Sequence, residues 1–304
     1  MASQAEWVAV DWGTSNVRAW GIADDSSHTF AASSDKGMGK IAKADFPHVL
    51  DELIGRQTEG ISELDVVICG MAGARQGWME APYLDTPADL NQLAKGAVRP
   101  TGADARYAPR ILPGVCQRQA GAEDVMRGEE TQLLGLLRLR PGFEGTAILP
   151  GTHSKWVEIR DGRIVRFSSA MTGEFYEVLS THSVLRHSFA GEVNGPATEA
   201  GVTEGMAAGL EHPELLTALA FRTRSASLLS GRGPDWCSGY LSGLLVGAEI
   251  GGHRDWLGSN PVPLIGSARF ERMYSAALAK IGIESFGIDA ADATIAGLME
   301  ARAQ

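Results

Sequence analysis

Apolar and polar positions alternate over residues 7–35 in short runs, and this pattern predicts successive β-strands. The runs WVAVDW, VRAWGIAD and HTFAASSD are separated by turn-forming residues at Gly13-Thr14 and at Asp24-Asp25-Ser26-Ser27. Residues 46–60 carry apolar side chains at helical spacing, and the run ELDVVICGMAG that follows is typical of a strand buried in a parallel sheet. We therefore expect an α/β unit that opens with a tight hairpin.

The sequence patterns that predict helices and strands are weaker between residues 80 and 143. Residues 80–110 contain many prolines and alanines and are expected to be irregular, whereas APRILPGV predicts one more short strand. The segment EDVMRGEETQLLGLLRL predicts a helix that begins near Asp124, and Pro141-Gly142 ends it.

The pattern of the N-terminus returns at residue 145. AVDWGTSNVRAW and AILPGTHSKWVEI share an apolar strand, a Gly-Thr pair, small polar residues and a returning strand with alternating apolar positions. Two copies indicate a single internal duplication and not a solenoid. We therefore predict two similar lobes, residues 1–143 and 144–304, whose Gly-Thr turns face each other across a cleft.

Helices dominate the rest of the second lobe. A Ser/His-rich segment extends to about residue 200, helices follow over 198–231, and GYLSGLLVGAEIG predicts a helix with glycines on one face. PVPLIG predicts a strand and GSAR the start of a helix that ends near residue 281. ADATIAGLMEARA predicts a last helix, for which a return to the first lobe is one alternative.

Composition limits the function classes. Hydrophobic residues make up 44% of the chain and charged residues 21%, as in ordinary globular proteins. The net charge of −10 argues against a nucleic-acid or membrane-surface binder, because both need a basic face. The three cysteines form no CxxC motif, so neither a disulfide framework nor a zinc site is indicated. The start MASQAEW lacks a secretion signal, and we expect a cytoplasmic protein.

Composition and net charge do not identify a function, but the residues of the first turn indicate one. Successive N–H groups in a turn between strands form a concavity suited to phosphate oxygens, and Gly13, Thr14 and Ser15 supply such a turn. Asp11 at the end of a buried strand is costly unless it holds water and a divalent ion. An ordinary hairpin is the alternative, but the second turn at Gly151-Thr152 favours a two-sided phosphate site.

At this point the chain resembles a known family. VDWGTSN and LPGTHSK in duplicated lobes resemble the actin-like ATPase superfamily, which includes sugar kinases, chaperone ATPases and exopolyphosphatases. More narrowly, GMAGARQGWMEAPYLDTPA, DVMRGEETQLLG, AMTGEFYEVL and LSGLLVGAEI resemble the 2-dehydro-3-deoxygalactonokinase family over nearly the whole chain. The resemblance implies two ribonuclease-H-like lobes with mixed five-stranded sheets, and transfer of phosphate from ATP to the 6-hydroxyl of 2-dehydro-3-deoxy-D-galactonate.

The resemblance also implies the nucleotide site. The first turn would bind the β- and γ-phosphates, with Asp11 holding Mg²⁺, and the second turn would bind phosphate from the other lobe. Pro150 stands where the superfamily usually has an acid, which leaves Asp11 as the main metal candidate. Adenine is expected at the junction of strand and helix near residue 266. The residues implied are Asp11, Gly13, Thr14, Ser15, Gly151, Thr152, His153, Ser154, Lys155, Gly266 and Ser267. Lys155 either neutralises the γ-phosphate or is an exposed strand residue without a role.

Phosphoryl transfer needs one carboxylate to accept the hydroxyl proton. Glu129 and Glu130 are the first candidates and Asp124 the second, while a solvated helix face is the alternative. Successive residues point about 100° apart on a helix, so at most one of the glutamates can face the substrate.

The sugar acid needs a cation for its carboxylate and a close backbone approach. The candidates are Gly73, Arg75, Trp78, Arg127, Thr172 and Glu174, and loop 36–40 is expected to cover the sugar. A polyphosphate or ATP hydrolase of the same fold and a non-catalytic sugar sensor are the rival functions, and a homodimer is left open. The expected partners are the sugar acid and ATP.

Overall fold

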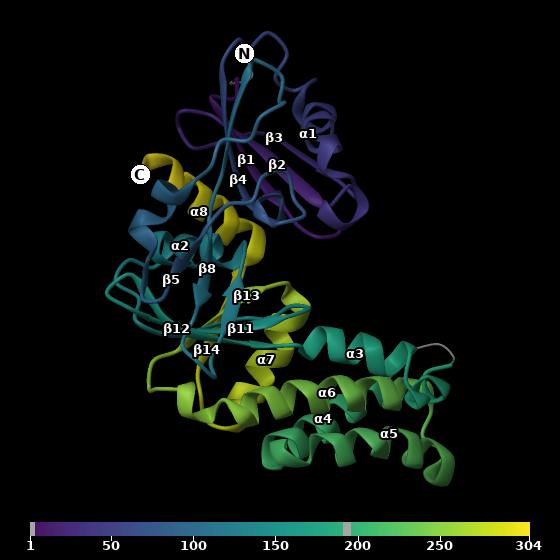
Figure 1. Ribbon diagram of the computed structural model, residues 1–304. Helices are drawn as coiled ribbons and strands as arrows, with labels where there is room; N and C mark the ends of the chain where they lie inside the picture. The colour runs from purple at the N-terminus through teal and green to yellow at the C-terminus, as the bar shows by residue number, and fades with distance from the viewer. Residues whose placement is uncertain (1–3, 191–195) are drawn as a thin grey trace. The chain divides into compact units, whose positions relative to one another are not determined.

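The computed structural model describes residues 4–190 and 196–304 and divides the chain into two compact units. Unit 1 consists of Met1–Glu144, Ile159–Phe167 and Ala290–Gln304, and unit 2 consists of Gly145–Glu158 and Ser168–Asp289. The first boundary thus follows Glu144, and the chain returns to unit 1 for its last helix (Figure 1). The predicted Ser/His-rich segment includes residues 191–195, which lie outside the described residues.

Unit 1 is built on a mixed sheet of five strands in the order β3-β2-β1-β4-β7. The first three strands are antiparallel, and β4 and β7 run parallel to β1. The predicted opening hairpin and five-stranded sheet are therefore confirmed. The bounds are β1 (Trp7–Trp12), β2 (Val17–Ile22), β3 (His28–Ser34), β4 (Leu64–Gly70) and β7 (Tyr107–Ile111).

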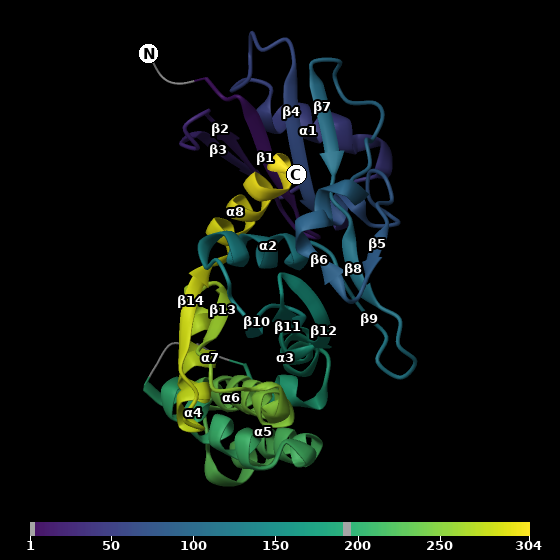
Figure 2. The same ribbon diagram turned by 90° about the vertical axis from the view of Figure 1, so that its left-hand side faces the viewer.

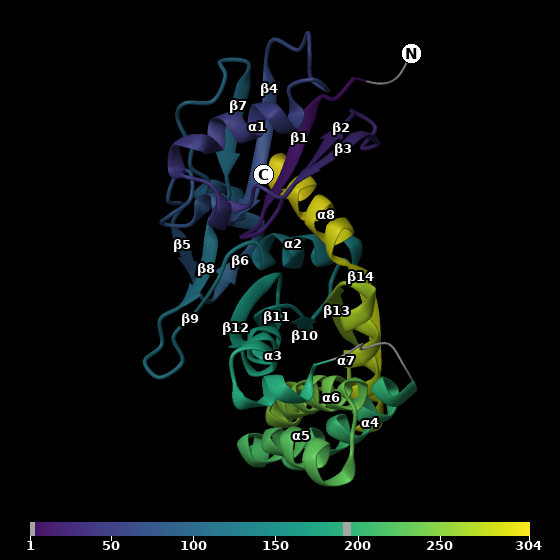
Figure 3. The ribbon, with the colours of Figure 1, turned by 90° about the vertical axis from the view of Figure 1, so that its right-hand side faces the viewer.

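The two-residue period of β1 sends its side chains to opposite faces of this sheet. Val8, Val10 and Trp12 belong to the core that packs against α1 (Phe46–Ile54). Trp7 and Asp11 therefore belong to the other face, where α8 (Ala290–Ala303) contacts β1 and β4. Figures 2 and 3 view the sheet from these two sides.

Glycines allow α8 to cross α2 (Glu129–Leu139) at very short range. A Cβ atom at Gly135 would lie 1.9 Å from the carbonyl oxygen of Ala293, and one at Gly297 would lie 1.9 Å from that of Thr131. Any larger residue at either position would force the helices apart. The position of the N-terminus of α2 in unit 1 therefore depends on α8.

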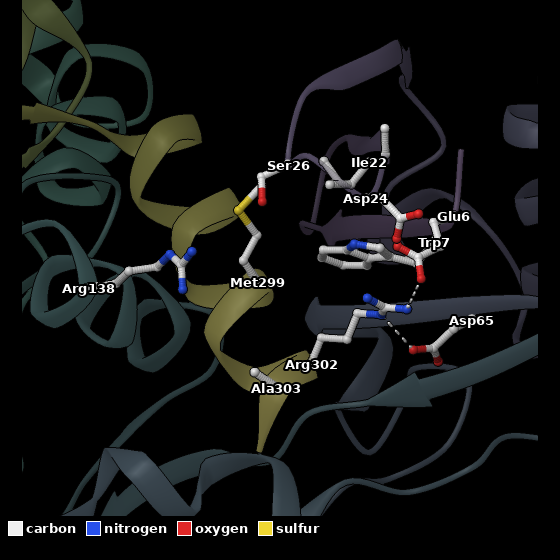
Figure 4. A pocket seen from close by; sticks show the side chains of 11 residues that line it. Glu6, Trp7, Ile22, Asp24, Ser26, Asp65, Arg138, Met299, Arg302 and Ala303 are labelled. Atoms are coloured by element: carbon white, nitrogen blue, oxygen red, sulfur yellow. Dashed lines mark hydrogen bonds and ion pairs between the residues drawn. The ribbon is translucent and has the colours of Figure 1, made fainter. Parts of the chain in front are cut away.

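Charged and aromatic groups attach the end of α8 to the sheet (Figure 4). The guanidinium carbon of Arg302 lies 5.3 Å from the ring centre of Trp7, and Arg302 forms ion pairs with Asp65 at 3.2 Å and Glu6 at 3.5 Å. These groups border a cavity of about 360 Å³. The contact fixes α8 to the edge of the sheet where β1 and β4 begin, which is the edge opposite to Asp11.

The region between residues 80 and 128 is more regular than predicted. A small sheet has the order β5-β8-β9, and Asp124 belongs to its last strand and not to a helix. The predicted helix begins five residues later, after Gly128, whose φ of 112° breaks the chain direction. The elements are β5 (Tyr83–Asp85), β6 (Ala88–Asp89), η4 (Leu90–Gly96), β8 (Gly114–Gln117) and β9 (Asp124–Met126), with η1 (Met38–Lys40), η2 (Lys43–Asp45) and η3 (Met71–Gly73) earlier in the unit.

Unit 2 repeats the sheet of unit 1 in the order β14-β13-β10-β11-β12. Pairing of β12 with β6 through Arg163 and Ile164, which belong to unit 1, adds a sixth strand to the five that were predicted. β14 was not predicted from the sequence. The bounds are β10 (Gly145–Leu149), β11 (Ser154–Arg160), β12 (Arg163–Ala170), β13 (Val262–Gly266) and β14 (Ser285–Asp289).

A layer of helices accompanies this sheet in unit 2 (Figure 1). The glycine face of α6 packs directly on α4: a Cβ atom at Gly243 would lie 2.2 Å from the carbonyl oxygen of Val202. The glycines on this face of α6 therefore serve helix packing. The helices are α3 (Thr172–Thr181), α4 (Pro196–Glu211), α5 (Leu216–Ser230), α6 (Pro234–Gly252) and α7 (Ala268–Lys280), with η5 (Val184–Ser188), η6 (Pro213–Leu215) and η7 (Arg254–Trp256). Over residues 4–190 and 196–304, no helix combines the length and apolar character needed to cross a membrane.

Candidate functional site

The turn after β1 is held in shape by a second segment of backbone. The carbonyl oxygens of Gly13, Thr14 and Ser15 accept hydrogen bonds from the N–H groups of Met38 (3.0 Å), Gly39 (2.8 Å) and Gly37 (3.3 Å). Segment 37–39 therefore supports the turn from one side. The expectation that loop 36–40 covers the sugar stays a prediction.

These bonds determine where the N–H groups of the turn point. In a trans peptide the C=O and the following N–H point in opposite directions. Because three carbonyls point toward segment 37–39, the N–H groups of Thr14, Ser15 and Asn16 point away from it. In the described part of the chain, these three N–H groups have no hydrogen-bond partner, and all three residues are exposed. Three such N–H groups in succession form a concavity for an anion.

Asp11 lies next to this concavity at the end of β1. Its carboxylate is 2.7 Å from Arg18 on β2, and its side chain is 19% exposed. The Cys69 thiol lies 3.9 Å from the same carboxylate, and burial, followed by the charges of Asp11 and Glu130, holds the pKa of this thiol well above its usual value. Asp11 therefore lies at the end of β1 from which the first turn begins.

One partly exposed carboxylate beside a concavity for an anion fits Mg²⁺, which commonly binds one or two carboxylates, phosphate oxygens and water. Among the described residues, no group of three or more His, Cys, Asp or Glu side chains could form a metal cage. Asp11 would therefore hold the ion together with the ligand's phosphates.

The N-terminus of α2 lies near Asp11 because two glycines remove the side chains between them. A Cβ atom at Gly70 would lie 3.5 Å from Asp11 Oδ1, and one at Gly128 would lie 3.4 Å from the Cα of Gly70. Both glycines have positive φ, at 85° and 112°, which favours glycine for a second reason. The first turn of α2 therefore lies close to the metal candidate.

The two glutamates at the start of α2 have different environments. Glu130 is fully buried, and its carboxylate accepts the Gly128 N–H at 2.8 and 2.9 Å. Burial, and then the charge of Glu129, raises the pKa of Glu130 to about 7. Glu129 is half-buried, and its Oε2 accepts the Arg127 N–H at 3.0 Å. Of the two, only Glu129 is open to a ligand.

The sugar-acid candidates in unit 1 fall into three environments. Arg127 donates to the Ala81 carbonyl at 2.9 Å and lies over the Tyr83 ring at 4.3 Å, while its Nε and Nη1 are buried with no partner in the described structure. A Cβ atom at Gly73 would lie 2.8 Å from this Nη1. Arg75 is exposed.

Trp78 is 5% exposed and lies in the core of unit 1. Its ring packs against Phe46 and Trp12, with ring centres 6.3 and 6.4 Å apart, and its N–H donates to the Thr101 carbonyl. The indole thus has its polar group satisfied inside the protein, so we no longer include Trp78 among the substrate contacts.

The second turn, in unit 2, is supported by the start of α3. Glu174 N–H donates to the Thr152 carbonyl at 3.1 Å, and the Glu174 carboxylate lies 2.5 Å from His153 Nε2. A Cβ atom at Gly173 would lie 2.6 Å from the Gly151 carbonyl oxygen. Gly173 therefore allows α3 to begin directly against the second turn. The start of α3 supports this turn in the way that segment 37–39 supports the first turn.

Lys155 and Ser154 follow this turn at the start of β11. Lys155 is 6% exposed and donates to Ser169 Oγ, so it is not the exposed strand residue of the second alternative. The Ser154 hydroxyl is buried and lies 2.9 Å from the Tyr274 hydroxyl. Both side chains are thus engaged inside unit 2.

Gly266 and Ser267 lie at the same edge of the sheet of unit 2 as the second turn. β10 and β13 are parallel, and a Cβ atom at Gly266 would lie 3.4 Å from the Pro150 carbonyl oxygen. Ser267 is exposed at the N-terminus of α7. The carboxyl ends of parallel strands are a common place for ligands.

Arg18 and Glu249 were not predicted from the sequence to contribute to the two turns. Gly37 belongs to loop 36–40, which was expected to cover the sugar and not to support the first turn. Arg18 could have been found from the hairpin register, which pairs it with Asp11. Glu249 is the one acid in the predicted helix GYLSGLLVGAEIG, which is otherwise mostly apolar and glycine-rich, and this contrast was the available signal. The long-range partner of Gly37 left no local signal.

With this geometry established, comparison with known proteins decides the family. A family model described as 2-keto-3-deoxy-galactonokinase matches residues 11–301. The chain belongs to this family. Membership of the 2-keto-3-deoxy-galactonokinase family confirms the resemblance inferred from the motifs.

Two curated relatives of this chain carry names of the same kind. A probable 2-dehydro-3-deoxygalactonokinase of Rhizobium meliloti (strain 1021) is 39% identical over 302 residues, covering 99% of this chain and 98% of the relative. The 2-dehydro-3-deoxygalactonokinase of Escherichia coli (strain K12) is 31% identical over 296 residues, covering 97% and 96%.

A solved structure supports the fold. The crystal structure of a Sinorhizobium meliloti protein, described as a candidate 2-dehydro-3-deoxygalactonokinase, is 40% identical, has a TM-score of 0.91 and covers 97% of each chain. The predicted two-lobed α/β fold of the actin-like class is therefore confirmed.

Proposed function

We propose that the protein is an ATP-dependent kinase that phosphorylates the 6-hydroxyl of 2-dehydro-3-deoxy-D-galactonate, giving 2-dehydro-3-deoxy-6-phospho-D-galactonate. One observation carries the proposal: in a member of this kinase family, the N–H groups of Thr14, Ser15 and Asn16 point together out of the first turn beside Asp11. This arrangement suits a phosphate with its metal ion. In this proposal ATP is the phosphate donor, and the reaction takes place in the cytoplasm.

The nucleotide residues have separate roles in the proposal. Gly13, Thr14 and Ser15 bind the terminal phosphates through backbone and hydroxyl groups, and Asp11 holds Mg²⁺, which neutralises phosphate charge when bound. Gly151, Thr152, His153 and Ser154 form the backbone of the second phosphate turn, and Lys155 adds positive charge at the start of β11. Gly266-Ser267 receives the adenosine part of ATP.

Glu129 is the proposed general base. The 6-hydroxyl oxygen attacks the γ-phosphorus, the bond from that phosphorus to the bridging oxygen breaks, ADP leaves, and Glu129 accepts the hydroxyl proton. Glu130 is fully buried and cannot reach a substrate, so it supports the start of α2 through the Gly128 N–H. Asp124 belongs to β9 and is not needed for this role.

Arg127 is the proposed partner of the substrate carboxylate. Its Nε and Nη1 are the two guanidinium nitrogens that lack partners in the described structure, and each can donate a charge-assisted hydrogen bond to a carboxylate oxygen. Gly73 leaves room beside Nη1, and exposed Arg75 is a second, weaker candidate. Thr172 and Glu174 contact Glu249 and His153, so we now assign them to the support of the second turn.

A panel of sugar acids incubated with Mg²⁺-ATP, with ADP measured by a coupled assay, tests the function. We expect ADP formation that depends on the sugar acid and is fastest with 2-dehydro-3-deoxy-D-galactonate. ADP formation without any sugar acid would favour the hydrolase alternative. Sugar binding with no ADP formation would favour the sensor, and a sedimentation experiment would decide whether the active species is a homodimer.

A further inference from the structure

Glu249 on α6 is a buried acid of unit 2 that the proposed reaction does not use. It is 7% exposed. Its Oε1 accepts the Trp156 indole N–H at 2.8 Å, and its Oε2 accepts the Tyr274 hydroxyl at 2.7 Å and also the Thr172 hydroxyl. A buried carboxylate is costly unless donors surround it, and here three donors from β11, α7 and α3 do so.

Two of these donors, Thr172 and Tyr274, connect Glu249 to the second turn, one on each side of the turn. Thr172 begins α3, and the next two residues contact the turn: Gly173 packs on Gly151, and Glu174 N–H donates to the Thr152 carbonyl. The Thr172–Glu249 hydrogen bond therefore fixes the position of the start of α3, which packs against the start of the turn.

The other side of the turn is connected through Tyr274. Because the Tyr274 hydroxyl donates to Glu249, its oxygen accepts from the Ser154 hydroxyl at 2.9 Å, at the residue where the turn becomes β11. Trp156, two residues further along β11, donates to the other oxygen of Glu249. The Glu249 carboxylate thus fixes the positions of both ends of the second turn.

We propose that Glu249 is a positioning residue for nucleotide binding, because it holds the second phosphate turn in its binding geometry through Thr172, Tyr274 and Trp156. The proposal rests on the proposed function, in which this turn binds phosphate of ATP. Glu249 does not touch the nucleotide, and its loss should therefore weaken nucleotide affinity without a matching change in sugar-acid affinity.

Glu249→Gln is the first test, because glutamine keeps the size but cannot accept hydrogen bonds at both ends. We expect the dissociation constant of Mg²⁺-ADP, measured by calorimetry, to rise roughly tenfold, since a hydrogen bond to a charged group is lost. The KM for ATP should rise in parallel, and the KM for the sugar acid should stay within about twofold.

Thr172 variants provide a second test that does not alter the carboxylate. Thr172→Val removes the hydroxyl at nearly constant shape and should weaken ADP binding in the same direction, whereas Thr172→Ser should restore it. The double variant Glu249→Gln/Thr172→Val should lose less than the sum of the two single losses, because both remove the same contact.

Val246→Ala on the same helix is the matched control for general destabilisation. Val246 is 3% exposed, so the change should lower the melting temperature while leaving the ADP dissociation constant unchanged. The proposal is overturned if Glu249→Gln and Thr172→Val lower the melting temperature as Val246→Ala does but bind ADP as wild type does. Wild-type protein that binds ADP but phosphorylates no sugar acid would refute the proposed function and leave this test of Glu249 intact.

Discussion

Asp11 and Arg18 face each other across the first hairpin, with carboxylate and guanidinium 2.7 Å apart. The hairpin register makes this pairing direct, because Asp11 on β1 lies opposite Arg18 on β2. A negative and a positive group thus stand together where the turn presents its free N–H groups. The arrangement can bind a metal ion and an anion at neighbouring positions, as transfer of a phosphoryl group from Mg²⁺-ATP requires.

Asp11→Asn should abolish Mg²⁺-dependent transfer and leave sugar-acid binding largely intact. Asparagine keeps the shape but loses the charge that would hold the ion, so we expect kcat to fall on the order of a hundredfold or more. Turnover measured over a Mg²⁺ titration, with sugar-acid binding followed by calorimetry, checks this. Unchanged turnover would show that another group holds the metal.

Gly37→Ala should distort the first turn. The added Cβ atom would lie 2.3 Å from the Ser15 carbonyl carbon and 2.4 Å from the Asn16 nitrogen, and both are backbone atoms that cannot move away cheaply. We expect the KM for ATP to rise on the order of tenfold, because the orientation of the N–H groups depends on segment 37–39.

Gly258→Ala is the matched control for this change, because a Cβ atom there meets nothing within 4 Å. It should leave the KM for ATP at the wild-type value. If Gly37→Ala behaved in the same way, segment 37–39 would not determine the shape of the turn.

The difference between Gly37 and Gly13 shows what the sequence could predict. Gly13 lies between two apolar strands, so local pattern was enough to identify its turn. Gly37 supports that turn through contacts with residues about 20 positions earlier in the chain, and no local pattern reports such a contact.

The errors at Asp124 and at β14 have other causes. Asp124 precedes a run of helix-forming residues, and this pattern predicts a helix start there, but Gly128 with φ of 112° separates β9 from α2. β14 has five residues, none of them fully buried, so it lacks the apolar run from which the equally short β13 was predicted. Glu249 was predicted to lie in a helix, but its three donors come from elements that only the fold brings together.

Arg127→Lys should weaken binding of the sugar acid and not of ATP. Lysine keeps the positive charge but has a single nitrogen and cannot place donors at the positions of both Nε and Nη1, so we expect the KM for the sugar acid to rise about tenfold or more. Arg118→Lys, an exposed arginine of the same unit, should change neither KM. An equal rise in both KM values for Arg127→Lys would contradict the assignment.

Glu129→Gln should lower kcat by about a hundredfold or more with little effect on either KM, because the amide cannot accept the hydroxyl proton. Steady-state kinetics with both substrates varied provides the measurement. Glu123→Gln, an exposed acid just before β9, should match wild type. A variant at Glu129 with normal kcat would remove it as the base.

The buried carboxyl of Glu130 should make stability depend on pH. Burial raises its pKa to about 7 in the folded protein, while an unfolded glutamate titrates near its ordinary value of about 4.3. Between these values the folded state binds more protons than the unfolded state, so the free energy of unfolding falls as pH rises and levels off above about pH 7. The total change is on the order of 3 kcal/mol.

Glu130→Gln should remove this dependence, because glutamine is neutral throughout and its carbonyl can still accept the Gly128 N–H. Urea unfolding followed by fluorescence between about pH 5 and about pH 8 would compare the slopes of variant and wild type. Glu80→Gln, which changes an exposed acid in the same unit, should keep the wild-type slope. If Glu130→Gln kept it as well, Glu130 would have to be ionised across this range, and its burial would have to be offset by donors other than the Gly128 N–H.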